Sequence, residues 1–137
     1  MTSLPENWRT QLTELRTTLY HLHKALVESE RSRYEAEHGP IGSSGKYLQL
    51  LINDRQFTWL QPYTRLVVSL DETLESKEAI LPAQVAQHWQ ETRSLTLGQI
   101  HDASTRYAQA HASSLRVQDQ HAILMAVLSE APPAQSQ

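Results

Sequence analysis

An uninterrupted helical pattern over residues 7–37 is the feature that most constrains the fold of this chain. The stretch contains neither proline nor glycine, and its leucines recur at spacings of three and four residues: Leu12, Leu15, Leu19, Leu22 and Leu26. At about 1.5 Å per residue it forms a rod of about 50 Å, whereas a globular chain of this length is only about 37 Å across. One end of the helix must therefore overhang the domain, pack against two shorter helices placed end to end, or meet a second subunit.

The same helix face turns polar beyond the last of these leucines. The next positions that point inward are Glu30, Arg33 or Tyr34, and Glu37. His23 precedes them on the same side. Ionisable side chains on a core face must be paired, bound to something or placed beyond the edge of the core. We therefore predict a ligand-binding site at this polar end, which Trp59 can join because its segment must fold back near Tyr34.

The other apolar patterns have the helical period as well. We expect a short helix over residues 46–53, a turn or two that begins with an N-cap at Asp54, and a core helix over residues 62–74. A further helix should span residues 82–95. Pro62 and Pro82 suit the first turns of these last two helices.

Two capping boxes are expected at helix starts. Ser3 and Glu6 form the first, at the beginning of the long helix. Thr96 and Gln99 form the second, and they should open a helix over residues 97–112 that is followed by one more apolar helix.

Composition agrees with one all-α domain. The 137 residues are enough for one core, and 39% hydrophobic with 20% charged residues is a globular balance. We predict a single helical domain over residues 1–131, built as an up-and-down bundle of four main helices with additional short helices. Residues 132–137 have the composition of a disordered tail.

Charge and hydropathy argue against two classes of partner. A net charge of −3 offers no basic field for nucleic acid. No apolar run approaches the roughly 20 residues that cross a bilayer, and the first residues lack a signal peptide. Because cysteine is absent as well, we expect a cytoplasmic protein without disulfides.

One segment has a family resemblance. Residues 21–72 contain an ER-x-RYE segment, a glycine loop, a leucine-rich helix and a D-x-x-F-x-WL-x-P motif. This segment resembles a group of small uncharacterised bacterial helical proteins. The resemblance implies a bacterial, cytoplasmic, all-helical domain and carries over no activity.

Metal binding is an open alternative. Glu35 and His38 form a Glu-x-x-His motif, but a ferritin-like di-iron site needs two such motifs and two further glutamates, and only one motif occurs here. A mononuclear site could instead combine His23 or His38 with Glu30 or Glu37 and a later histidine. The usual interpretation of such a charged segment is a solvated helix face.

The glycine loop over residues 39–46 resembles a phosphate loop without matching it. The P-loop motif needs four residues between its glycine and Gly-Lys, followed by Ser or Thr, whereas here five intervene and tyrosine follows. A weaker alternative is an anion held at the start of the next helix by Ser43, Ser44 and Lys46.

The sequence contains no catalytic arrangement that we can recognise, and it implies no cofactor. We therefore predict a protein-interaction or scaffold module that self-associates, as a homodimer, because the long helix favours a second subunit. The alternative is a bundle that binds a small ligand or a metal at the polar end of the long helix.

Overall fold

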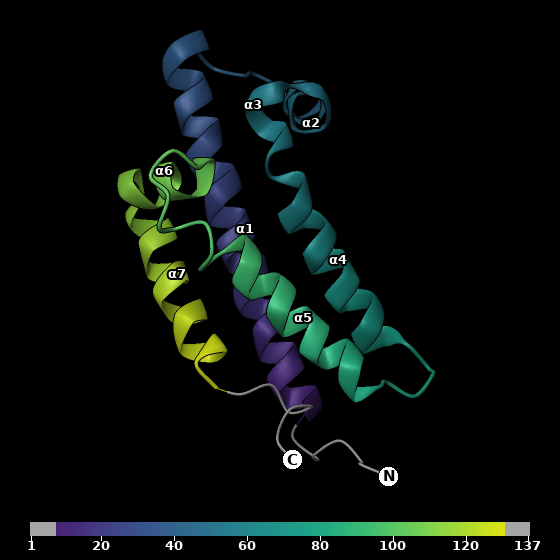
Figure 1. Cartoon of the computed structure of the whole chain (residues 1–137). Helices are drawn as coiled ribbons and strands as arrows, with labels where there is room; N and C mark the ends of the chain where they lie inside the picture. Colours follow the sequence, from purple (N-terminus) through teal and green to yellow (C-terminus); the bar gives the residue numbers. More distant parts are fainter. Residues whose placement is uncertain (1–7, 131–137) are drawn as a thin grey trace.

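α1 (Trp8–His38) is the axis against which the other helices pack (Figure 1). The computed structural model describes residues 8–130. On one side of α1 lie α4 (Gln61–Glu75) and the single-turn α3 (Arg55–Thr58), and on another lie α7 (Leu115–Leu128) and α6 (Arg106–Ser113). Shorter helices in succession thus cover the long one, which is one of the three arrangements expected from its length. That length alone does not call for a second subunit.

The all-α class predicted from the sequence is confirmed. Residues 8–130 form helices and turns and contain no strand. The two remaining helices are α2 (Ser44–Asn53) and α5 (Pro82–Leu95), of which α5 packs on α4. The more specific arrangement, an up-and-down bundle of four main helices, stays a prediction.

The leucine stripe of α1 forms the centre of the core. All five predicted leucines of the stripe have no exposed surface. They share one cluster with buried side chains from α3, α4, α5, α6 and α7. The largest of these side chains are Phe57, Tyr63, Trp89 and Tyr107, and their burial removes large apolar areas from water.

Side-chain caps begin several of the shorter helices. Ser43, Asp54, Thr105 and Ser114 each accept a hydrogen bond from a backbone N–H two or three residues further on. α4 and α5 instead carry a proline in the first turn. The predicted helix starts at Asp54 and near the two prolines are therefore confirmed.

Residues 96–105 form turns and bends rather than the predicted helix, so the capping box at Thr96 and Gln99 is wrong. The hydroxyl and the backbone N–H of Thr96 both donate to the carbonyl of Thr92, at 2.6 and 3.1 Å. The N–H of Gly98 also bonds back into α5, at 2.9 Å. These bonds complete the C-terminus of α5, and the next helix begins only with α6.

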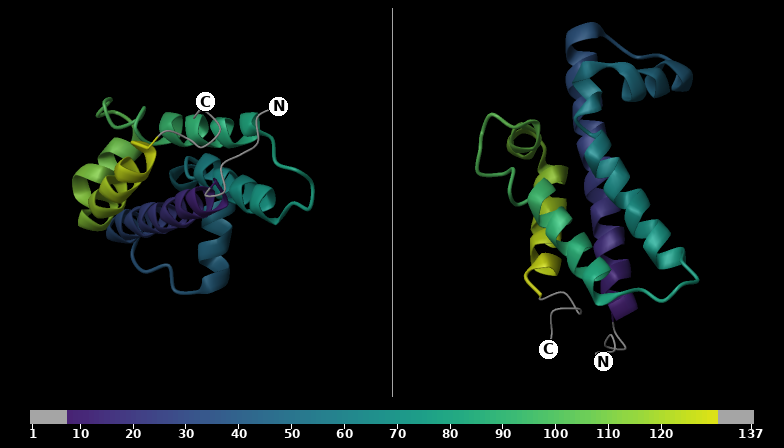
Figure 2. Two further views of the ribbon diagram at one scale, coloured as in Figure 1. Left: turned by 90° about the horizontal axis from the view of Figure 1, so that it is seen from below. Right: turned by 45° about the vertical axis from the view of Figure 1, so that its right-hand side comes forward.

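α2 extends outward near the C-terminal end of α1 (Figure 2). The connecting loop turns at Gly39 and Gly42, whose φ angles of 83° and 90° lie in the left-handed region that favours glycine. Half of the ten residues of α2 are large and apolar, yet none of the ten is buried.

The capping box at Ser3 and Glu6 and the tail over residues 132–137 lie outside the described residues. Within residues 8–130, no helix combines the length and the hydropathy that a bilayer span requires.

Candidate functional site

The carboxylate of Glu30 lies buried at the polar end of α1, where only 4% of the residue is exposed. The indole N–H of Trp59 donates to its Oε1 atom at 2.7 Å. The side-chain amide of Gln56 donates to its Oε2 atom at 3.0 Å. Gln56 and Trp59 are three residues apart, so one helical turn of α3 supplies both donors.

Two of the predicted ligand residues, Glu30 and Trp59, therefore meet, and they bind each other. Each carboxylate oxygen accepts one hydrogen bond from the protein, so this group joins α1 to α3 and to its C-cap residue Trp59. Gln56 was not among the predicted residues. Its position one turn before Trp59 is the signal that could have identified it.

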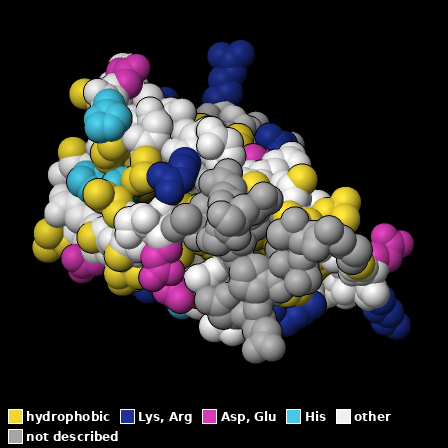
Figure 3. Space-filling view, turned by 60° about the horizontal axis from the view of Figure 1, so that its bottom comes forward, with side chains coloured by type: hydrophobic (Ala, Val, Ile, Leu, Met, Phe, Trp, Pro, Cys, Tyr) yellow, Lys and Arg dark blue, Asp and Glu magenta, His cyan; other side chains and the backbone are white. Residues whose placement is uncertain are grey.

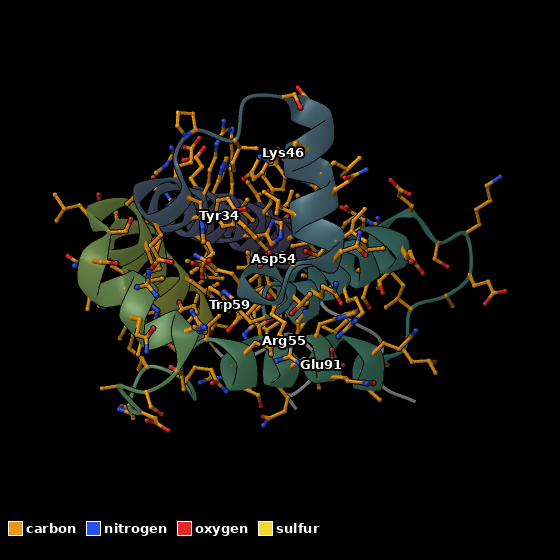
Figure 4. The ribbon with its side chains drawn as sticks, turned by 90° about the horizontal axis from the view of Figure 1, so that it is seen from above. Tyr34, Lys46, Asp54, Arg55, Trp59 and Glu91 are labelled. Carbon is orange, nitrogen blue, oxygen red and sulfur yellow. The ribbon has the colours of Figure 1, made fainter. Side chains whose placement is uncertain are left out.

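Tyr34 and Glu37 take no part in this arrangement. The ring of Tyr34 packs against Phe57 and His38, with centroid distances of 5.6 and 4.4 Å. Glu37 is exposed, and its carboxylate lies 3.8 Å from the ring of His38. Figure 4 shows Tyr34 on α1 and Trp59 on the neighbouring segment, with Lys46 on α2.

His23 lies on another part of the α1 surface, where it faces α4. Its Nε2 atom is 2.7 Å from the hydroxyl oxygen of Thr64. Burial lowers the pKa of His23 below its usual value of 6.5. His23 and Glu30 therefore belong to different sites.

A groove of about 440 Å³ opens where α1, α2 and α4 meet. We call it the α1–α2–α4 groove. Its volume lies within the range of small-molecule sites, about 300–1,000 Å³. Apolar side chains from α1, α2 and α3, together with Leu60 just before α4, line most of it: Val27, Leu48, Leu51, Ile52, Phe57 and Leu60.

Polar side chains gather in the same groove: His23, Gln61, Thr64 and Arg65. The amide of Gln61 donates to the backbone carbonyl of Ile52 at 3.3 Å and thereby links α4 to α2. Arg65 is exposed, and within residues 8–130 it forms none of the ion pairs. No acidic residue lines the groove.

A second hollow, of about 690 Å³, lies on the loop side of α2 and contains Ser43 and Ser44 but not Lys46. The hydroxyl of Ser43 already caps α2. The carboxylate of Glu35 also lines this hollow, where it accepts from the N–H of Ile41 at 3.0 Å. The three predicted anion-binding residues therefore do not line one hollow together, and the carboxylate of Glu35 lies 3.5 Å from Arg31, which lines the hollow as well.

Within residues 8–130, no three side chains of the metal-binding types come together. Glu35 and His38 use their side chains in separate local contacts. The nearest pair of histidines is His111 and His121, whose ring centroids are 4.9 Å apart.

His121 belongs to a buried aromatic contact between α6 and α7. Its Nδ1 atom is 2.6 Å from the hydroxyl oxygen of Tyr107. Burial is the main cause that lowers the pKa of His121, and the neighbouring His111 lowers it further. Burial also raises the pKa of the Tyr107 hydroxyl, so this hydroxyl keeps its proton and can donate to the imidazole.

α7 is apolar on more than one side. Its buried face carries Val117, Leu124 and Leu128, while its exposed face carries a second set, which we call the outer α7 face: Leu115, Ala122, Ile123, Met125 and Ala126. No aspartate, glutamate, lysine or arginine occurs between residues 120 and 129. Hydrophobic side chains are visible on the left of Figure 3, the side on which α7 lies in Figure 1.

Comparison with known proteins returns no match for this chain among family models, curated proteins or solved structures.

Proposed function

We propose that this protein is a cytoplasmic interaction module that self-associates, and that two copies meet through the outer α7 face. The observation that supports this most directly is the apolar character of α7 on both its buried and its exposed sides. A helix that is hydrophobic all round is normally buried on all sides. One side of α7 lies against α1, and a second copy would cover the other.

The chemistry of the outer α7 face suits a copy of itself. Residues 121–128 carry no formal charge, so this part of two identical faces would not repel, whereas the exposed Asp119 lies on the same side one turn before Ala122. Ala122 and Ala126 lie one turn apart near its centre, and their small side chains would let two helix backbones approach closely. Ile123 and Met125 flank them and are 49% and 50% exposed, so each would lose a large apolar area from water.

A two-fold axis through this face would give an isologous contact in which the same residues serve both copies. The uncharged part of α7, residues 121–128, would give about 12 Å of paired helix. Such a contact needs no other part of the surface, and the α1–α2–α4 groove would stay open.

The mass of the purified protein in solution tests the proposal. At micromolar concentration we expect light scattering to report twice the chain mass of 15.6 kDa. Ile123→Glu should give the single-chain mass, because it places two like charges in the contact. Val68→Glu is the matched control, because Val68 is a β-branched helix residue on α4 with a similar exposure of 48%. It should keep the double mass.

Because the chain contains no cysteine, single cysteines report on the geometry directly. Under mild oxidation Ala126→Cys should form a covalent dimer, since a disulfide requires Cα atoms within about 7 Å. Ala112→Cys, an exposed helix position on α6, should not. A wild-type protein of single-chain mass, or equal cross-linking at both positions, would overturn the proposal.

A further inference from the structure

We propose that the α1–α2–α4 groove binds a linear amphiphile, an unbranched apolar chain that ends in a carboxylate. This inference is independent of self-association through α7, because the groove and the outer α7 face lie on different helices.

The apolar part of the groove fits a hydrocarbon chain. Its deepest residues are Phe57 and Leu60, which are 0% and 3% exposed. Leu48 and Ile52 stand along α2 with 58% and 56% of their surface exposed, so they offer apolar area that a chain could cover. Each additional buried methylene group strengthens binding, which favours a long chain over a short one.

The polar residues define one end of the groove. Arg9, near the start of α1, donates to the carbonyl of Leu74 near the end of α4, whereas His23, further along α1, meets Thr64. The two helices are therefore antiparallel. His23 lies one turn from Val27 on α1, and Thr64 lies one turn from Leu60 on α4, so both polar residues lie at the end of the groove away from α3.

Arg65 gives this polar end its charge. It follows Thr64 on α4, and within residues 8–130 neither an ion pair nor a side-chain hydrogen bond occupies it. A carboxylate there could pair with its guanidinium, whereas the hydroxyl of Thr64 already donates to the carbonyl of Leu60 at 3.3 Å. Since no acidic side chain lines the groove, a cationic head would find no partner in it.

Calorimetric titration with three soluble probes tests the inference. Decanoate should bind. Octanoate is two methylenes shorter and should bind at least about fourfold more weakly than decanoate, because each of those methylenes would be partly buried in the groove. Decyltrimethylammonium, which has the same chain and the opposite charge, should bind at least about tenfold more weakly than decanoate.

Two substitutions address the two ends of the groove. Arg65→Glu should weaken decanoate binding about tenfold, because it replaces an attractive charge by a repulsive one. Leu48→Glu, at an exposed position of α2, should weaken it as well, because it puts a charge against the hydrocarbon chain. Arg106→Glu on α6 is the matched control for charge, and it should leave the affinity unchanged.

Three outcomes would overturn the inference. These are no binding of decanoate, equal binding of the anionic and cationic probes, and equal affinity of wild type and Arg65→Glu. A change of solution mass in Leu48→Glu would also overturn it, because it would assign the groove to a second copy of the chain. A failure of self-association through α7 would appear as a single-chain mass in the wild type, which is a separate measurement.

Discussion

The indole nitrogen of Trp59 lies 2.7 Å from the carboxylate of Glu30 and donates a hydrogen bond to it. The pair connects the polar end of α1 to the segment that precedes α4, in a place where Glu30 is almost fully buried. The second oxygen of Glu30 receives the amide of Gln56. Both partners are neutral, whereas the sequence would have allowed His23 or an arginine to pair with this glutamate.

Removal of the Glu30 carboxylate should destabilise the fold, because the buried N–H of Trp59 would lose its acceptor. We expect Glu30→Leu to lower the free energy of unfolding by about 2–4 kcal/mol in urea denaturation. Trp59→Phe should cost less than Glu30→Leu, and the double variant should cost less than the sum of the two. Glu37→Leu, at an exposed position of the same helix, should change stability by no more than about 0.5 kcal/mol. If the losses of stability in the two single variants add up in the double variant, the contact between Glu30 and Trp59 is contradicted.

The free energy of unfolding should fall as the pH drops below about 6.5. Burial lowers the pKa values of His23, His88 and His121 in the folded protein, so near neutral pH these groups are kept in their neutral form. Above the unfolded pKa of about 6.5 both states are neutral and stability is complete. Below it the unfolded chain takes up protons first, so stability is lost until each folded pKa is reached.

Urea denaturation between pH 7.5 and pH 5.5 measures this loss, at pH values chosen to bracket the reference pKa of about 6.5. Each of the two most buried histidines, His88 and His121, contributes at most about 1.4 kcal/mol per pH unit within its own window. His88→Gln should reduce the slope, while His21→Gln, at an exposed position, should leave it unchanged. A flat profile for wild type would contradict the burial of these rings.

Replacing Gly42, in the loop before α2, or Gly45, within α2, by alanine should change the free energy of unfolding in opposite directions. Gly42 has a φ of 90°, so Gly42→Ala should lower the free energy of unfolding by about 1–2 kcal/mol. Gly45 lies inside α2, and a Cβ added there meets nothing within 4 Å. Gly45→Ala should therefore raise the free energy of unfolding by about 0.4–1 kcal/mol. Equal signs in thermal or urea unfolding would show that the loop turns differently.

The hydroxyl of Tyr107 should stabilise the contact between α6 and α7. Tyr107→Phe leaves the Nδ1 atom of the buried His121 without its partner, and we expect a loss of about 1–2 kcal/mol in urea denaturation. Tyr20→Phe is the control, because Tyr20 is 45% exposed. Tyr20→Phe should not measurably change the free energy of unfolding. An equal loss in both variants would contradict the stabilising hydrogen bond of Tyr107.

The helical fold could be predicted from the sequence because its apolar spacings are regular. The leucine stripe of α1 and the helix starts at Asp54, Pro62 and Pro82 followed from local rules that tertiary contacts did not change. The stretch over residues 96–105 could not be predicted in the same way. Its Ser/Thr-x-x-Gln pattern fits a helix start, but the backbone groups at the end of α5 compete for the same donors.

The site was harder to predict, because it depends on pairs that are distant in the chain. Helical periodicity correctly placed Glu30 on the buried face, but it could not show that Trp59 and Gln56 would satisfy both oxygens. The groove depends on where α2 lies. That position follows from the turn at Gly39 and Gly42, for which the sequence indicated a loop without a direction.

The packing of α1 against α7 also bears on how the chain is synthesised. The leucine stripe emerges from the ribosome early, whereas α7, which covers one side of it, is made some ninety residues later. Until then α3, α4 and α6 can cover part of the leucine stripe, but the side that α7 covers stays exposed. A nascent chain that stops before Leu115 therefore presents a row of leucines to chaperones and to other nascent chains, so the core should close only once α7 has been made.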